Sequence, residues 1–229
     1  MKRAIVSLAT RKGHYIKGVA RLGESLRDNF QGDFFAFIGE QAVGSPMHEA
    51  SNYAFKIHAM DVAFERGYDQ VIWLDASCFA ICPVQPLFDL IDRDGILMQD
   101  SGHFLGTWTN DRTLNYFGIS RDDAMGMRMF GNAGMLGIDI HNKKAKRFYE
   151  MYRKSMMNGY FHGAWNNNDR SQSEDERCLG HRHDNSCGSA VAHLLGLNTL
   201  YHPGDQILQY AGPYDKIANE TIIIKARGL

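Results

Sequence analysis

Residues 71–80 read VIWLDASCFA: four large apolar residues run directly into an aspartate, which two small residues follow. A short apolar run without polar alternation is typical of a strand that is covered on both faces of a parallel sheet. Ligands of such sheets bind beyond the carboxyl ends of the strands. Asp75 directly follows the expected strand at 70–74, so it is either a turn cap or a residue of the functional site.

The segments before this stretch show the same kind of order. Apolar runs predict strands at 4–8 and 33–38, and apolar residues at helical spacing predict helices at 17–29 and from 53 to the glycine at 67. Strand, helix, strand, helix, strand in this order predicts an α/β fold with a mostly parallel sheet and right-handed crossovers.

The second half is less regular. Strands are expected at 95–98, 134–140 and 221–224, and helices at 145–156 and near 191–196. Residues 101–131 resemble a loop-rich insertion, and the polar residues within 163–180 have no apolar period and indicate a mobile loop. Without a repeat or linker, residues 1–229 are expected to form a single domain.

Composition limits the functions that we considered. The chain has 229 residues, 44% of them hydrophobic, and a net charge of −1, which weakly disfavours a nucleic-acid polymer as partner. No apolar run is long enough for a membrane span or a signal peptide, so a cytoplasmic protein is expected. The four cysteines are expected to be reduced thiols, with a zinc site at Cys178, Cys187 and nearby histidines as the alternative.

The residues around Asp75 favour a nucleotide site that differs from the two common glycine-rich types. Ala76 and Ser77 are small enough for a ligand to approach the backbone. Neither GxGxxG nor GxxxxGK[ST] occurs near an expected strand, which argues against a nicotinamide dinucleotide fold and against a P-loop.

Four stretches resemble the GT-A glycosyltransferases, and within them the group of glycogenin and galactinol synthase. They are WLDAS at 73–77, PLFDLI at 86–91, NAGMLGIDI at 132–140 and HRHDNSCGSAVAHLLGL at 181–197. The resemblance implies a Rossmann-like GT-A sheet with helices on both faces. It also implies a hexosyltransferase type of reaction, in which a sugar passes from a nucleotide-diphosphate donor to an acceptor hydroxyl with retention of configuration. It leaves the donor, the acceptor and the oligomeric state open.

The resemblance and the expected strand ends together give a set of candidate residues. Asp75 and Asp184 are the catalytic candidates, although Asp184 also suits a helix N-cap. Trp108, His181 and His183 are candidates for acceptor binding, and the alternative is a loop anchor for Trp108 and a structural role for the histidines. The donor-binding candidates are Thr10, Arg11, Tyr15, Lys56, Asp75, Ala76, Ser77, Gln99, Asp100, Asn132, Ala133 and Gly134.

One departure from the family concerns the metal. Ser77 stands where the resembling family has a second metal-binding aspartate, so a divalent cation such as Mn²⁺ or Mg²⁺ would have Asp75, diphosphate oxygens and water as ligands. The family's C-terminal metal-binding histidine is also not evident. Cations such as Lys56, Lys225 and Arg227 are candidates to neutralise the leaving group instead, unless they are solvated surface charges.

Two other functions remain open at this point. The missing second acid favours a non-catalytic domain that binds a nucleotide or glycan. A phosphatase of the haloacid-dehalogenase type also places an aspartate after an apolar strand, but it needs a second aspartate where Ser77 stands.

Overall fold

The computed structural model describes residues 1–11, 13–130, 134–164, 167–203 and 207–226. Its main sheet has the order β2-β1-β3-β7-β5-β6, with β8 paired to β5. These strands are β1 (Arg3–Ala9), β2 (Asp33–Ile38), β3 (Gln70–Leu74), β5 (Ile96–Phe104), β6 (Arg128–Phe130), β7 (Met135–Asp139) and β8 (Tyr201–His202). β1, β2 and β3 are parallel, whereas β7 and β6 run antiparallel to their neighbours. The predicted α/β fold with a mostly parallel sheet is confirmed.

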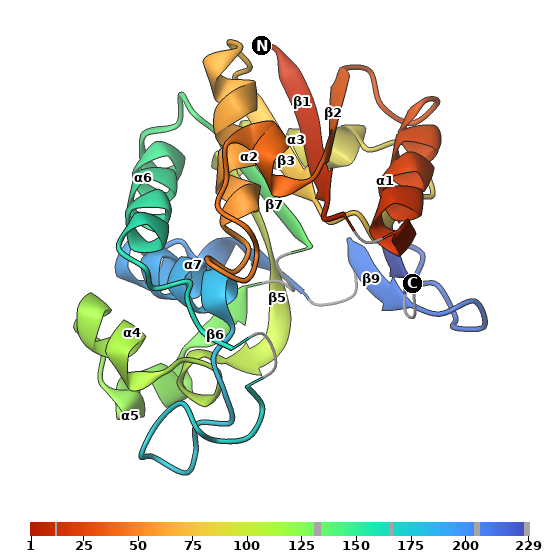
Figure 1. Ribbon diagram of the computed structural model, residues 1–229. Coiled ribbons are helices and arrows are strands. Elements are labelled where there is room, and N and C mark those ends of the chain that lie inside the picture. Colours follow the sequence, from red (N-terminus) through yellow and green to blue (C-terminus); the bar gives the residue numbers. More distant parts are fainter. Residues whose placement is uncertain (12, 131–133, 165–166, 204–206, 227–229) are drawn as a thin grey trace.

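Helices cover both faces of the sheet, as predicted. The side chains of each strand alternate between the two faces, so both faces carry apolar residues that the helices bury. Val71 and Trp73 of β3 pack in the cluster that includes α2, α6 and α7, whereas Ile72 and Leu74 pack against α1 and α3. Figure 1 shows α1 and α6 on opposite sides of the sheet. The helices that cover the sheet are α1 (Gly13–Leu26), α2 (Ala54–Glu65), α3 (Gln85–Asp94), α6 (Lys143–Met157) and α7 (His183–Leu194).

A second, small sheet joins the end of the described chain to the segment that follows Asp75. It consists of β4 (Cys78–Ala80), β10 (Ile223–Ala226) and β9 (Leu208–Ala211), in the order β4-β10-β9. β10 pairs antiparallel with β4, which sets Lys225 opposite Cys78. The strand expected at 221–224 therefore exists, but it belongs to this separate sheet.

The described part of the predicted insertion, residues 101–130, contains short regular elements. Residues 101–104 extend β5, and the turn η2 (Leu105–Thr107) and the helices α4 (Asp111–Phe117) and α5 (Arg121–Gly126) follow. The side chains of Asn110 and Ser120 cap these helices by accepting hydrogen bonds from backbone N–H groups. Leu114 of α4 and Ala124 of α5 pack with Ala190 of α7. Short capped helices of six or seven residues carry too little apolar period to be recognised from sequence.

The described residues of 163–180 contain neither helix nor strand. They lie beside α4 and α5 at one end of the molecule (Figure 1), where the Leu179 N–H donates to the Thr107 carbonyl and Ser173 donates to Asp111. The movement expected of this segment stays a prediction.

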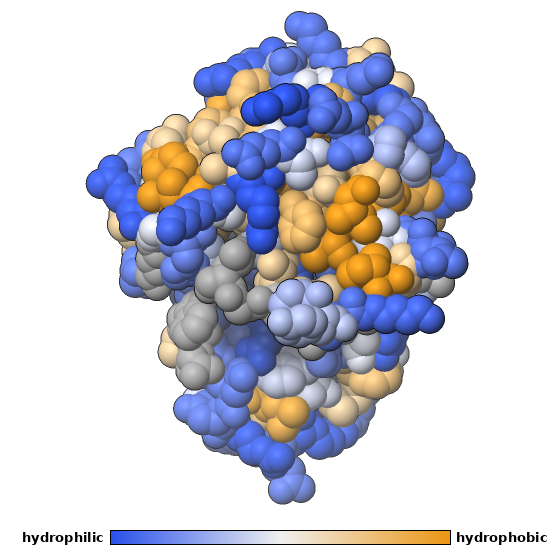
Figure 2. Space-filling view, turned by 90° about the vertical axis from the view of Figure 1, so that its right-hand side faces the viewer, coloured by the Kyte–Doolittle hydropathy of each residue, from blue (hydrophilic) through white to orange (hydrophobic). Residues whose placement is uncertain are grey.

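None of the helices within the described residues is long and apolar enough to cross a membrane. The face of the molecule seen in Figure 2 is largely hydrophilic, and its hydrophobic side chains form separate patches on the left and on the right of the view.

Helix α7 approaches the sheet closely because Gly188 has no side chain. A Cβ atom at this position would overlap the Phe130 ring and lie 3.3 Å from Tyr152. We therefore expect Gly188→Ala to lower the free energy of unfolding by about 1–3 kcal/mol, the usual cost of overpacking a core. Urea denaturation followed by circular dichroism measures this loss.

Gly126→Ala is the matched control, because a Cβ atom at the end of α5 meets nothing within 4 Å. Alanine there is expected to be neutral or slightly stabilising. Equal stability of the Gly188→Ala variant and the wild type would show that α7 packs differently.

Candidate active site

A cavity of about 650 Å³ opens beyond the carboxyl ends of β1 and β3. This size is typical of small-molecule sites, and the position is the one where α/β sheets bind ligands. The lining residues are Leu8, Thr10, Tyr15, Glu40, His48, Glu49, Asn52, Tyr53, Phe55, Trp73, Asp75, Ala76, Ser77, Gly163, Ala164, Tyr210, Lys225 and Ala226.

Asp75 enters this cavity because β3 ends one residue before it. The Asp75 backbone N–H donates to the Gly134 carbonyl at 2.9 Å, and the Asp75 carbonyl accepts from the Cys78 N–H at 2.8 Å. The side chain keeps 21% of its surface exposed. The aspartate is therefore held firmly by its backbone while its carboxylate faces the cavity.

Asp75 belongs to a chain of four alternating charges. Its Oδ2 lies 2.6 Å from Lys225 Nζ, and its Oδ1 lies 3.6 Å from Lys56 Nζ and accepts from the Trp73 indole N–H at 2.9 Å. Lys56 Nζ donates in turn to Asp184 Oδ2 at 2.9 Å. The order Asp184, Lys56, Asp75, Lys225 joins α7, α2, β3 and β10 at one point.

Pairing keeps the inner members of this chain charged. Burial opposes ionisation of Asp75, but Lys225 and then Lys56 outweigh burial and hold the pKa of Asp75 below its usual value. Burial likewise opposes the charge on both lysines, but Asp184 and Asp75 raise the pKa of Lys56, and Asp75 raises that of Lys225. The wall of the cavity therefore carries a fixed carboxylate beside the Lys225 ammonium, and the Lys56 ammonium contacts the same carboxylate without lining the cavity.

Tyr53 supports Lys56 from the start of α2. It adopts φ 60° and ψ 8°, a left-handed conformation that is uncommon for residues other than glycine and is found at functional sites. In this conformation its ring centroid lies 4.6 Å from Lys56 Nζ, and the ring also contacts His48 and His183. Aromatic faces attract cations, so Tyr53 stabilises the buried ammonium.

Asp184 is not the helix N-cap that its position before an apolar segment suggested. α7 begins one residue earlier, at His183, and Arg182 occupies the N-cap without a side-chain hydrogen bond. Asp184 lies in the first helical turn, is only 2% exposed and pairs with Lys56. It does not line the cavity and reaches Asp75 through Lys56.

The two neighbouring histidines are buried beside each other, with ring centroids 5.2 Å apart. His181 accepts from the Asn110 N–H and contacts the Tyr160 carbonyl through Nε2, and burial lowers its pKa to about 3. His183 contacts the Phe161 carbonyl through Nδ1. Neither lines the cavity, so an acceptor-binding role for either stays a proposal.

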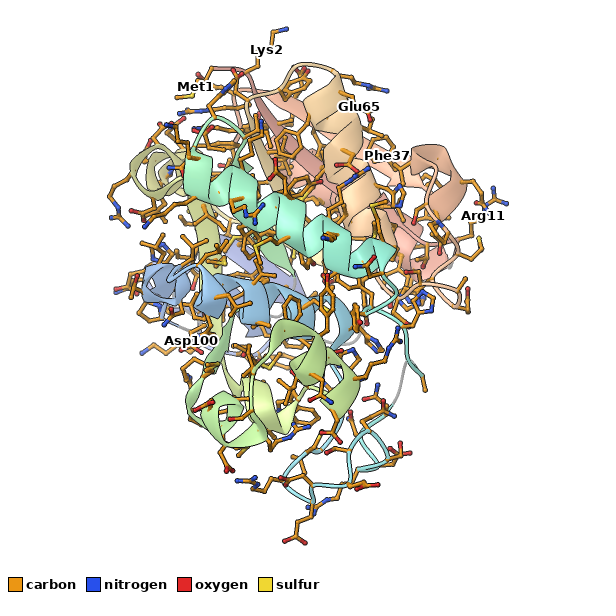
Figure 3. The ribbon with its side chains drawn as sticks, turned by 90° about the vertical axis from the view of Figure 1, so that its left-hand side faces the viewer. Met1, Lys2, Arg11, Phe37, Glu65 and Asp100 are labelled. Carbon is orange, nitrogen blue, oxygen red and sulfur yellow. The ribbon has the colours of Figure 1, made fainter. Side chains whose placement is uncertain are left out.

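Lys56 and four other predicted residues lie outside the cavity lining. Gln99 both donates to and accepts from the Leu208 backbone, and Asp100 pairs with Arg128. Trp108 lies beneath the Arg182 guanidinium. Arg11 is exposed, and Figure 3 shows Arg11 and Asp100 at opposite edges of the molecule.

The structure gathers Thr10, Tyr15, Asp75, Ala76 and Ser77 at the cavity, as the sequence led us to expect. Asn132 and Ala133 lie outside the described residues, as does Arg227. Gly134 is described but does not line the cavity, and a Cβ atom there would lie 3.3 Å from Lys225 Nζ. Glycine at this position lets Lys225 pass to Asp75.

Sequence reasoning missed the contribution of the segment between β2 and α2. Glu40, in the turn η1 (Glu40–Val43), together with His48, Glu49 and Asn52 lines the cavity. Glu40 is buried, and its carboxylate accepts from the His48 N–H at 3.2 Å. The one available signal was that Glu40 follows the carboxyl end of a parallel strand, as Asp75 does.

Metal-binding residues were sought throughout the described ranges. No group of three or more histidine, cysteine or acidic side chains in them has a metal-binding arrangement. All four cysteines are free, as predicted, and Cys178 and Cys187 contact backbone carbonyls.

No protein-family profile matches the sequence, and no curated protein matches it. Solved structures do match the fold. The apo structure of the WbbM bifunctional glycosyltransferase aligns with a TM-score of 0.57 at 10% identity over 100% of this chain, which spans about half (46%) of the WbbM chain. The apo form of mouse xyloside xylosyltransferase 1 aligns with a TM-score of 0.52 at 10% identity over 98% of this chain and 97% of its own. The chain therefore shares the fold of these two glycosyltransferases, in agreement with the predicted GT-A fold.

Removal of Lys56 tests whether the charge chain stabilises the fold. We expect Lys56→Met to lower the free energy of unfolding by about 3–5 kcal/mol, because it leaves the buried Asp184 carboxylate without its cation. Urea denaturation near neutral pH measures the loss.

Arg153→Met is the control, since Arg153 forms a more exposed ion pair with Asp61 and should cost about 1 kcal/mol or less. Comparable losses in the two variants would contradict a structural role for the buried charges.

Proposed function

We propose that this chain is a glycosyltransferase that moves a sugar from a nucleotide-diphosphate donor to an acceptor hydroxyl. The observation that carries the proposal is the cavity at the ends of β1 and β3, where Asp75 is held between Lys56 and Lys225. The glycosyltransferase fold supports it. In this proposal residues 1–229 act as one catalytic domain.

The chemistry of the cavity suits the parts of such a donor. Tyr15, Tyr53 and Tyr210 offer aromatic faces for a base or a sugar ring. Lys225 offers positive charge to a diphosphate, and the small Ala76 and Ser77 leave room for it. Glu40, Glu49 and Asn52 offer oxygen atoms to sugar or base hydroxyl and N–H groups.

In the proposed reaction, the bond between the anomeric carbon and the β-phosphate oxygen breaks and leaves its electron pair on that oxygen. The acceptor oxygen forms the new bond to the anomeric carbon. Its proton passes to the departing phosphate if configuration is retained, as the resemblance to the glycogenin group implies. Asp184 is the proposed base for an inverting reaction, or a contact of the acceptor, with Trp108, His181 and His183 as further candidates for acceptor binding.

The compartment of the reaction is also part of the proposal. Four free thiols support a reducing compartment such as the cytoplasm.

The Asp75→Asn variant tests the donor site. The amide keeps the shape of the side chain but removes the charge that holds Lys225, so we expect transfer to fall by about 10²–10³-fold while the fold remains intact. A panel of nucleotide sugars is first screened by thermal shift, because a ligand that binds the native state raises the melting temperature. Release of nucleoside diphosphate in the presence of an acceptor then measures turnover.

Asp122→Asn provides the matched control, since this carboxylate is 83% exposed and lies outside the cavity lining. Full activity of Asp75→Asn would place the donor site elsewhere. Donor binding by the wild type without transfer or hydrolysis would favour a non-catalytic binding domain, and hydrolysis of an aryl phosphate would favour a phosphatase.

The Asp184→Asn variant separates transfer from donor binding. Asparagine can still accept a hydrogen bond from Lys56, so we expect the donor Kd to change by less than about threefold and kcat to fall by about tenfold or more. Calorimetry with the donor and steady-state kinetics measure the two quantities. Equal losses of binding and turnover would show that Asp184 only supports the fold around Lys56.

A further inference from the structure

The residues at Asp75 do not fit a divalent cation. Mg²⁺ and Mn²⁺ require several oxygen ligands in a regular shell. Asp75 Oδ2 is already 2.6 Å from the Lys225 ammonium, and Oδ1 accepts from the Trp73 indole N–H. Ser77 supplies no second carboxylate, and the described residues provide no alternative metal-binding group.

Lys225 occupies the place at Asp75 that such a cation would need. β10 pairs with β4 and so returns the chain to the residues just after Asp75, and Gly134 leaves space for the lysine side chain. The Lys225 side chain is 14% exposed and lines the cavity. Its position is therefore fixed by backbone pairing, and its side chain reaches the cavity.

The charges balance in the same way as in a metal site. Two carboxylates and one divalent cation sum to zero, and so do Asp75 and Lys225. Lys56 is neutralised separately by Asp184. A diphosphate that enters the cavity consequently meets the Lys225 ammonium, whose charge Asp75 already balances. The site therefore avoids the cost of an unpaired buried charge.

We propose that Lys225 replaces the divalent cation of this site, so that the diphosphate of the donor binds through the Lys225 ammonium without any metal. This inference rests on the proposed function, because it concerns the same cavity and the same donor. Lys225 also neutralises the charge that develops on the β-phosphate oxygen as the sugar leaves. Asp75 acts as a positioning residue that holds the ammonium in place.

Isothermal titration calorimetry with inorganic pyrophosphate and a panel of nucleoside diphosphates tests the proposal on the wild-type protein. We expect at least one nucleoside diphosphate to bind in EDTA with a Kd within about twofold of that in Mn²⁺, since no metal bridge is broken. Binding in Mn²⁺ that disappears in EDTA would overturn the role of Lys225 but leave the proposed transferase function standing. Absence of binding under both conditions would overturn both proposals, and neither comparison depends on the folding of a variant.

Substitution of Lys225 identifies the cation. We expect Lys225→Gln to weaken binding in EDTA by about 10- to 100-fold, the range expected when a charged hydrogen bond is lost, and Lys225→Arg to retain most of the affinity. Lys154→Gln, at an exposed lysine of α6, is the control and should bind as the wild type does. Circular dichroism confirms the fold of each variant, and a folded Lys225→Gln protein with wild-type affinity would contradict the assignment.

Discussion

The pairing of buried charges is the constraint on which this structure depends. A charge that leaves water costs several kcal/mol unless an opposite charge and hydrogen bonds replace the solvent. Asp184, Lys56, Asp75 and Lys225 meet this requirement together, because each of the two inner members contacts two neighbours of opposite charge and the four charges sum to zero. The four elements that carry these charges, α7, α2, β3 and β10, must therefore come together in the folded protein. The site consequently forms as part of the folding of the core.

The side chains that pack around these charges help to hold them in position. Trp73 lies in the apolar cluster of the sheet and at the same time donates its indole N–H to Asp75. Tyr53 takes a left-handed conformation and contacts Lys56 with its ring. Glycine at 188 lets α7 approach the Phe130 ring, one helical turn after Asp184. Residues that pack around the charges thus also determine where the charges lie.

Sequence reasoning located the parts of the fold that depend on local pattern. The strands at 33–38 and 70–74 were predicted with the bounds that the structure has, because their apolar residues are continuous. The direction of β7 was beyond prediction, since an apolar run is the same in a parallel and an antiparallel strand. The short helices α4 and α5 were missed because their stability comes from caps and from contacts with α7.

The site was predicted in the same partial way. Thr10 and Asp75 directly follow strands, and Tyr15, Ala76 and Ser77 lie within six residues of a strand end, so that their position at the cavity could be inferred from the chain itself. The ion pair of Asp75 and Lys225, in contrast, joins residues 150 positions apart. It depends on a second sheet whose strand pairing no local sequence pattern predicts. Asp184 was identified as a functional candidate, but its contact with Lys56, 128 positions away, became evident only from the structure.

The late position of Lys225 in the chain has a consequence for biosynthesis. Asp75 leaves the ribosome 150 residues before the lysine that neutralises it, which is a delay of about 8–30 s at ~5–20 residues per second. During this interval the nascent chain lacks both the cation and strand β10, so its cavity is incomplete. A ligand of this cavity therefore meets a complete pocket only after nearly all of the chain described here has been synthesised.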